Sequence, residues 1–336
     1  MTYDEVREKA REKILRCNAC PVCNGIACGN TIPGPGSKAP GNGANVNWSA
    51  WQKIGLNMDV FAPDGDVSTD CELFGAKLKL PLLSGPIGAL TQYSQEDVTL
   101  EFNDGVIEAA AKSGFVDCFG DGVTPQTLPG GLISMGHWKA PAIPILNPFP
   151  NEVILKHIET INRSSALAIG VVADSAGLSV WTGKGLKFRT RTVDEMKELK
   201  AAAKKPLLIK GIMTAKNAEQ AAEAGADAII VSNHGGRVLP YSPATAEVLP
   251  EIVAAVGGSV KIIVDGGLRS GADILKALAM GADGVMICRP FAVAWFGAGA
   301  EGVQVYAEKL RRELVEAMYM CGARSIDDIS PDMVRL

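Results

Sequence analysis

Short apolar runs alternate with longer, more polar stretches from residue 78 onward, and this alternation is the main pattern of the chain. The runs are rich in Val, Ile and Leu and have the length of buried strands rather than of helices. They predict eight strands, at 78–84, 115–119, 142–146, 166–173, 206–210, 228–232, 261–264 and 284–288. Helical periodicity follows three of the later runs, at 214–224, 243–256 and 271–280.

Eight strand–helix units predict an α/β fold of the (β/α)8 barrel type. The triplet Gly-Ala-Asp recurs before two of the strands, at 225–227 and 281–283, as a weak echo of one repeated unit. A doubly wound sheet would usually carry a Gly-x-Gly-x-x-Gly turn after its first strand, and the sequence has none there. We therefore expect a barrel over residues 78–336 and an N-terminal segment over residues 1–77.

The N-terminal segment is predicted to contain two helices and a long irregular stretch. Residues 2–16 carry apolar positions on one helical face, and Thr2 with Glu5 can form a capping box at its start. Residues 29–47 are rich in Gly, Pro and Asn, which predicts irregular backbone. A short helix is expected at 48–56.

Composition and charge exclude several classes of protein. The chain has 336 residues, of which 47% are hydrophobic, so it can bury a large core, and its net charge is −4. The sequence has no basic stripe or tail, which argues against a nucleic-acid partner. No apolar run reaches the roughly 18–20 residues that cross a bilayer, and the charged start is unlike a secretory signal. We expect a soluble, cytoplasmic protein with neither a nucleic-acid nor a membrane partner.

Candidate chemistry lies where the second half of the chain leaves its strands, since barrels carry their active sites at the carboxyl ends of the strands. Lys210 follows the fifth strand, and Ser-Asn-His-Gly-Gly-Arg at 232–237 follows the sixth. His234 is one of only three histidines, which makes it the leading candidate for a proton acceptor. Arg237, three residues later, suits a substrate that carries a carboxylate beside a hydroxyl.

The last two strands end in motifs that suit a phosphate group. Asp-Gly-Gly-Leu-Arg occupies 265–269, and Cys-Arg-Pro occupies 288–290. Glycines let main-chain N–H groups approach phosphate oxygens, helix N-termini add positive potential, and arginine adds charged hydrogen bonds.

Together these motifs resemble the signature of the FMN-dependent α-hydroxy-acid oxidase/dehydrogenase family, which includes glycolate oxidase and lactate oxidase. The resemblance implies bound FMN and the oxidation of a small 2-hydroxy acid, with the Cα hydrogen passing as hydride to flavin N5. It implies that His234 is the catalytic base, that Asp174 orients it, and that Arg237 binds the substrate carboxylate. It also implies a homo-oligomer, a tetramer or larger.

The same resemblance implies a set of flavin contacts. Lys210 would lie at the N1–C2 edge of the flavin, where a fixed ammonium stabilises the negative charge of the reduced ring. Ser84, Gly85 and Pro86 would meet the isoalloxazine ring through their backbone. The other expected cofactor contacts are Ser232, Asp265, Gly266, Gly267, Arg269, Cys288 and Arg289.

The chain departs from the family pattern around the substrate. Family members carry one tyrosine in the N-terminal segment and another after the third strand, but here residues 40–46 contain none and Asn147-Pro148-Phe149 follows that strand. A second arginine after the fourth strand is also missing, and the stretch 178–184 offers only Trp181 and Lys184. These departures predict a substrate other than glycolate or lactate, with a larger molecule among the options.

Four cysteines near the N-terminus, Cys17, Cys20, Cys23 and Cys28, follow the spacing Cys-x2-Cys-x2-Cys-x4-Cys. Three interpretations stay open: a [4Fe-4S] cluster that takes electrons from the flavin, a structural Zn site, and reduced thiols without metal. The other four cysteines, Cys71, Cys118, Cys288 and Cys321, have apolar neighbours and are expected to pack as small core residues.

Two other functions remain as alternatives. One is an FMN-dependent isomerase of the same barrel type, related to the isopentenyl-diphosphate isomerases, although Arg237 beside His234 argues against it. The other is a metal-binding electron-transfer protein centred on the cysteine cluster. The electron acceptor could be oxygen, a cluster or a protein, and the sequence does not choose among them.

Overall fold

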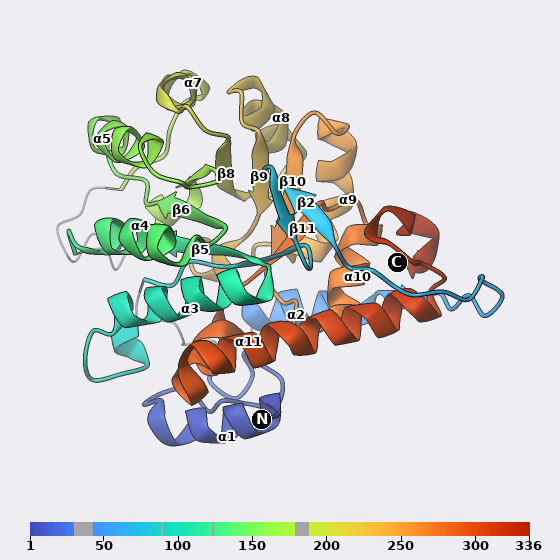
Figure 1. Ribbon diagram of the computed structural model, residues 1–336. Coiled ribbons are helices and arrows are strands. Elements are labelled where there is room, and N and C mark those ends of the chain that lie inside the picture. The colour runs from blue at the N-terminus through green and yellow to red at the C-terminus, as the bar shows by residue number, and fades with distance from the viewer. Residues whose placement is uncertain (30–42, 89, 123, 179–187) are drawn as a thin grey trace.

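Eight parallel strands close into a barrel, in the computed structural model, which describes residues 1–29, 43–88, 90–122, 124–178 and 188–336. The barrel closes where the last strand pairs in parallel with the first, with Val285 opposite Leu82. Figure 1 shows the helices arranged around this barrel. The strands in order are β4 (Leu82–Ser84), β5 (Val116–Gly120), β6 (Ala142–Leu146), β7 (Ile169–Val172), β8 (Leu207–Ile212), β9 (Ala228–Val231), β10 (Lys261–Asp265) and β11 (Gly284–Ile287).

All eight predicted strands are present, with ends that differ by a few residues. The first prediction, 78–84, was wrong in extent, because its start belongs to a separate antiparallel hairpin of β2 (Cys71–Leu73) and β3 (Ala76–Leu78). Leu73 and Leu78 of this hairpin pack with the side chains that fill the barrel, among them Ile263 and Met286. The hairpin therefore adds side chains to the core inside the barrel, while its strands are not part of the barrel sheet.

Helices connect the strands and cover the outside of the barrel (Figure 1). The three that the sequence predicted are confirmed within one or two residues. The sequence prediction did not specify the others. The helices are α3 (Thr99–Ser113), α4 (Thr127–Trp138), α5 (Asn151–Asn162), α7 (Val193–Ala202), α8 (Ala215–Glu223), α9 (Thr245–Val256), α10 (Gly271–Ala279) and α11 (Arg289–Met320).

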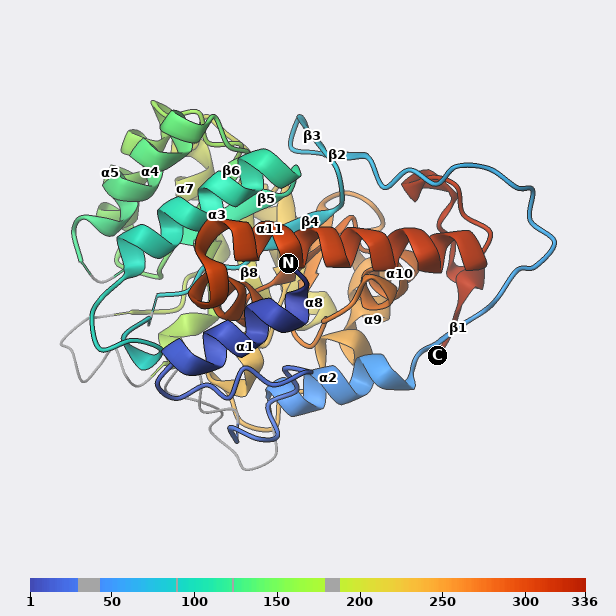
Figure 2. The same ribbon diagram turned by 60° about the horizontal axis from the view of Figure 1, so that its bottom comes forward.

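The N-terminal segment packs against the barrel helices rather than standing apart from them. Helix α1 (Tyr3–Lys13) has the predicted capping box at Thr2 and lies along α11, with Val6 and Ala10 fully buried (Figure 2). Helix α2 (Ala44–Lys53) contacts α9 and the loop after β9.

Helix α2 starts earlier than the predicted 48–56, so the expectation of irregular backbone was wrong for residues 44–47. The rest of that expectation, at 30–42, lies outside the described residues. Helix α2 ends at Lys53 because Gly55–Leu56 forms β1, which pairs with β12 (Val334–Arg335). Short 3-10 turns lie at Leu90–Gln92, Asp174–Gly177, His234–Gly236, Ile326–Asp328 and Pro331–Met333. Within the described ranges, no helix combines the length and apolarity needed to span a membrane.

Candidate active site

A buried ionic cluster joins the ends of three neighbouring strands. Lys210 on β8 places its Nζ 2.8 Å from Oδ2 of Asp265 on β10, and it donates a hydrogen bond of 2.6 Å to Oγ of Ser232 after β9. The Ser232 hydroxyl in turn donates to Asp265 at 2.9 Å. Burial lowers the pKa of Lys210, but the carboxylates of Asp265 and Asp174 outweigh it and raise the pKa above its usual value. The barrel rim therefore holds a permanent ammonium.

His234 and Asp174 form a hydrogen-bonded pair beside this cluster. Asp174 begins the short turn after β7, and its carboxylate oxygens lie 2.9 and 3.1 Å from Nδ1 of His234. Because a carboxylate only accepts, Nδ1 carries the proton and Nε2 is left with the lone pair. The imidazole is therefore oriented as a proton acceptor at Nε2.

The charges of the pair follow from its surroundings. Burial lowers the pKa of His234, and the positive charges of Arg237 and Lys210 add to this, against the opposing effect of Asp174. Burial raises the pKa of Asp174, but its electrostatic interaction and hydrogen bond with His234, together with the positive charges of Lys210 and Arg237, bring it below its usual value. At neutral pH the site therefore combines a neutral imidazole with an ionised carboxylate.

Two guanidinium groups face the same region. Arg237 is fixed by a hydrogen bond of 3.0 Å from its Nε to the carbonyl of His234. Burial lowers the pKa of Arg237, and the positive charge of Arg289 lowers it further. Two cations close enough to affect each other favour the binding of anions between or beside them.

The Gly266–Gly267 turn after β10 is packed closely against α2. Both glycines have φ of 89°, and a Cβ on Gly267 would lie 2.5 Å from the backbone of Asn47. The Trp51 indole donates to the Gly266 carbonyl at 2.8 Å. A side chain on either glycine would clash with α2 and would require a strained backbone, so glycine is needed at both positions. The close packing against α2 fixes the main chain of this turn at the rim of the barrel.

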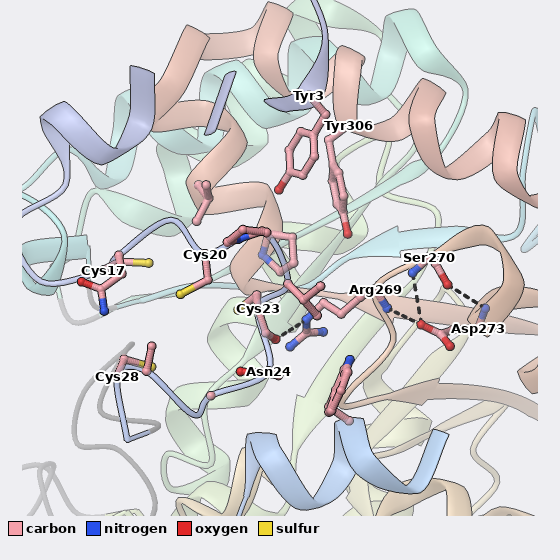
Figure 3. Close-up of a pocket in the computed structure, with 18 of the residues that line it drawn as sticks. Tyr3, Cys17, Cys20, Cys23, Asn24, Cys28, Arg269, Ser270, Asp273 and Tyr306 are labelled. Carbon is pink, nitrogen blue, oxygen red and sulfur yellow. Dashed lines mark hydrogen bonds between the residues drawn. The ribbon is translucent and has the colours of Figure 1, made fainter. Parts of the chain in front are cut away.

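The N-termini of the two last barrel helices differ in a way that suits a phosphate. Helix α10 is capped by its own side chains, Ser270 and Asp273. Helix α11 begins at Arg289, and no side chain in the described part of the chain caps it. Pro290 has no N–H and the Phe291 N–H donates to the Cys288 carbonyl at 2.9 Å, so it is mainly the guanidinium of Arg289 at this helix start that suits a phosphate oxygen. Arg269, also expected at the phosphate, donates from Nε to the Cys23 carbonyl at 2.7 Å (Figure 3). Its phosphate contact stays a prediction.

The first strand ends in a tightly packed backbone. Ser84 is 1% exposed, and its hydroxyl donates to the carboxylate of Asp117 on β5, so its side chain is already engaged. A Cβ on Gly85 would collide with Sγ of Cys288. The main chain of 84–86 lies at this end of the strand, and its contact with a cofactor stays a prediction. Burial raises the pKa of Asp117 to about 7.

Two positions that sequence reasoning missed hold the histidine loop in place. The side-chain amides of Asn47 and Asn233 exchange two hydrogen bonds, of 2.8 and 2.9 Å, and both residues are buried. Gly211 has φ of 106°, and a Cβ there would lie 2.6 Å from the Asp174 side chain. Asn47 lies in a stretch predicted to be irregular, and no local signal marks Gly211, so neither could be found without the fold.

Of the two departures from the family pattern after the third and fourth strands, only the first lies within the described residues. Asn147, where a tyrosine was expected, donates from its backbone and its amide to the buried carboxylate of Asp121, at 3.1 and 2.6 Å. His157 lies 3.7 Å from the same carboxylate. Trp181 and Lys184 lie outside the described residues.

The four N-terminal cysteines, Cys17, Cys20, Cys23 and Cys28, line one cavity of about 240 Å³ next to Arg269 (Figure 3). None of the eight cysteines forms a disulfide. Within the described ranges, no three His, Cys, Asp or Glu side chains already surround a single metal-sized point. Cys118 and Cys321 are buried, as expected of core residues, and Cys71 and Cys288 are partly buried and pack against the core of the barrel, so the expectation holds in part for them.

The fold and site define an α/β barrel whose rim combines a proton acceptor, a cluster of cations and a place for phosphate. A family model described as FMN-dependent dehydrogenase matches residues 147–336, more than half of the chain. The chain therefore belongs to the FMN-dependent dehydrogenase family, as the sequence motifs indicated. Family membership implies FMN as the cofactor, and the rim offers what FMN needs: an arginine at a helix start for phosphate and a buried ammonium for the ring.

Curated relatives resemble part of the chain. A peroxisomal (S)-2-hydroxyacid oxidase of Arabidopsis thaliana is 42% identical over 160 residues, which cover 46% of this chain and 44% of the relative. An L-lactate oxidase of Lactobacillus jensenii is 40% identical over 168 residues, covering 49% of this chain and 40% of the relative. The matches thus span less than half the length of these relatives.

Solved structures resemble nearly the whole chain. A mandelate oxidase structure with (S)-mandelic acid superposes with a TM-score of 0.81 over 99% of this chain and 97% of the other, at 24% identity, which supports the fold. A flavocytochrome b2 structure with pyruvate bound has a TM-score of 0.77 at 26% identity, over 88% of this chain and 80% of the other.

Proposed function

We propose that the protein oxidises a 2-hydroxy acid to the 2-oxo acid with bound FMN. One observation carries the proposal: the oriented His234–Asp174 pair stands beside Arg237, whose guanidinium is tied to the His234 carbonyl. A base and a carboxylate-binding cation are thereby held in a fixed relation, as a substrate with adjacent hydroxyl and carboxylate groups requires. FMN, when bound, supplies the acceptor for the hydrogen and two electrons that leave Cα.

In this reaction His234 accepts the hydroxyl proton at Nε2. Asp174 stabilises the imidazolium that results, because its carboxylate stays ionised next to Nδ1. Arg237 would bind the substrate carboxylate, and Lys210 would supply a positive charge to the cofactor ring, whose electron density increases on reduction.

The remaining site residues would hold the cofactor. The backbone of Ser84, Gly85 and Pro86 lies at the rim end of β4, where a flat ring could rest. Ser232 and Asp265 hold Lys210 in place. The residues that would bind the phosphate end of FMN lie around the last two strands and are Gly266, Gly267, Arg269, Cys288 and Arg289.

The substrate is proposed to differ from those of the relatives named as hydroxyacid and lactate oxidases. Asn147 and Asp121 form a polar pair at the rim where a tyrosine was expected. A polar amide in place of an aromatic ring leaves more room and a different hydrogen-bonding surface. We propose a 2-hydroxy acid with a longer or more polar side chain than lactate, and a homo-oligomeric enzyme that passes its electrons to an acceptor protein.

Anaerobic mixing of the FMN-loaded protein with a panel of 2-hydroxy acids tests the proposal. At least one acid should bleach the visible absorbance of the flavin and yield the matching 2-oxo acid in equal amount. If no member of the panel bleaches the flavin while a prenyl diphosphate is isomerised, the isomerase alternative is correct. A purified protein that cannot be loaded with FMN would contradict both.

A further inference from the structure

We propose that Cys17, Cys20, Cys23 and Cys28 ligate a [4Fe-4S] cluster in the cavity that they line, and that this cluster carries electrons away from the flavin. The site itself is argued from the cysteine cavity alone. Its role as the electron outlet rests on the proposed function.

The cavity is built for a group larger than one ion. The cysteine segment between α1 and α2 forms one side of it, and α10 and α11 contribute to the other. Residues 17–28 contain neither helix nor strand and form a loop along the cavity. Figure 3 shows the four cysteines following one loop around the same space, beside Arg269.

The volume of the cavity favours a cluster over a single zinc ion. Zinc needs its four ligands at one point, with sulfur about 2.3 Å from the metal. The thiols in the described structure do not converge in this way, while the cavity measures about 240 Å³. A [4Fe-4S] cluster binds each thiolate to a different iron, so it suits sulfurs spread around a cavity.

The charges around the cavity suit an anionic group. Four thiolates give such a cluster a net negative charge, and Arg269 lies in the cavity wall with its Nε bonded to the Cys23 carbonyl. The two acidic residues in the wall are already engaged. Asp4 is paired with Arg7 at 2.8 Å, and Asp273 accepts from the backbone N–H groups of Arg269 and Ser270.

The cavity also adjoins the phosphate end of the proposed flavin site. Arg269 lies two residues after the Gly266–Gly267 turn, and Pro290 and Val293 in the cavity wall belong to the first turn and a half of α11. The helix start proposed to bind phosphate therefore also forms a wall of the cysteine cavity. A cluster here would be separated from FMN by this thin layer of protein.

The electron count balances with a one-electron partner. Oxidation of the hydroxy acid to the oxo acid releases two electrons and two protons. Each electron in turn would reduce the cluster from the 2+ to the 1+ state and then leave to a soluble one-electron carrier protein, so that two carriers are reduced per substrate.

Metal analysis of anaerobically purified and reconstituted protein tests the site. We expect about four iron and four sulfide per chain in the wild type and in the control Cys71→Ser, whose thiol belongs to the β2–β3 hairpin and does not line the cavity. Cys20→Ser and Cys23→Ser should lose most of the iron, with circular dichroism unchanged and FMN still bound. Zinc at one per chain, no metal, or equal iron in all variants would overturn the proposal.

Electron paramagnetic resonance tests the role. Dithionite should produce the signal of a reduced cluster in the wild type, and the substrate should produce it as the flavin bleaches. Cys20→Ser should still bleach with substrate but give no cluster signal. If the cluster stays oxidised while the substrate reduces the flavin, the role as electron outlet is wrong, but the cluster site is not. If no hydroxy acid bleaches the flavin, the proposed function is contradicted. The iron content of the variants then still decides whether the cluster site exists.

Discussion

His234 has a left-handed backbone, with φ of 56°, which is unusual for a residue other than glycine and costs on the order of 1–3 kcal/mol. Several hydrogen bonds hold it there. Its N–H donates to Ser232 Oγ at 3.2 Å, and the next N–H, of Gly235, donates to the side chain of Asn233 at 3.0 Å. With Nδ1 fixed by Asp174, both the backbone and the ring are determined, so Nε2 can point in only one direction.

Replacing Asp174 by Asn should slow the chemical step and shift its pH dependence. The carboxylate raises the pKa of His234 against the effect of burial, so its loss lowers that pKa further. The acid limb of the rate profile, where the imidazole becomes protonated, should move to lower pH. The maximal rate of flavin reduction should fall at least about tenfold, because the imidazolium loses its counter-charge. Stopped-flow reduction across pH measures both, and an unchanged profile would contradict the assigned role.

Replacing Gly211 by Ala should disturb the same pair through space. The new Cβ would lie 2.6 Å from the Asp174 side chain, at a φ of 106°. We expect a loss of flavin reduction of about tenfold or more together with lower stability. Gly257→Ala is the matched control, since φ is 51° there but nothing lies within 4 Å. It should lower the melting temperature while leaving the rate per bound flavin intact. Equal activity in the two variants would contradict the proximity argument.

At the scale of elements, three adjacent strands deliver Lys210, Ser232 and Asp265 to one place. Their cluster could be predicted from sequence, because each residue ends a recognisable apolar run and parallel strands end at the same rim. The contacts by which α2 supports the histidine loop could not be predicted from sequence. Asn47 reaches Asn233 across 186 positions of sequence, and no local pattern encodes such a distant contact. The β2–β3 hairpin was missed because its strands, of three residues each, are too short to show alternation.

Replacing Asn47 by Ala should loosen the histidine loop. The side-chain amide of Asn233 and the backbone N–H of Thr245 both donate to Asn47 Oδ1, and the change removes this acceptor. The free energy of unfolding should fall by roughly 1–3 kcal/mol. Denaturant unfolding should show this loss, and the KM for substrate should rise. Asn57→Ala removes two hydrogen bonds to the C-terminal segment, at the carbonyls of Asp332 and Val334, and should leave KM unchanged. A stable Asn47→Ala variant with normal KM would show that α2 does not support the site.

The contact between β4 and β5 should make stability depend on pH. Asp117 has a pKa of about 7 in the fold, against roughly 3.9 when exposed. Between these values the folded chain binds a proton that the unfolded chain releases, so stability falls as pH rises toward 7. Asp117→Asn removes this penalty, worth on the order of 4 kcal/mol. The melting temperature of the variant should exceed that of the wild type increasingly from pH 5 to pH 8. A difference that is constant across this range would contradict the raised pKa.

For the molecule as a whole, the N-terminal segment is packed into the barrel structure and does not form a separate unit. Helix α2 secures the loops after β9 and β10, and the cysteine segment is tied by Cys23 to Arg269. The barrel and the identity of the rim residues followed from periodicity and motifs. The fit between segment and barrel depends on side-chain contacts between distant parts of the chain, which a single sequence does not reveal.

Flavin reduction in a His234→Asn variant tests the central claim most directly. Asparagine tolerates the left-handed backbone at this position but cannot act as the base. The variant should bind FMN as the wild type does and be bleached by dithionite, yet a hydroxy acid that bleaches the wild type should reduce it at least about a hundredfold more slowly. Bleaching at the wild-type rate would show that the proton is taken elsewhere and that the rim does not work as described.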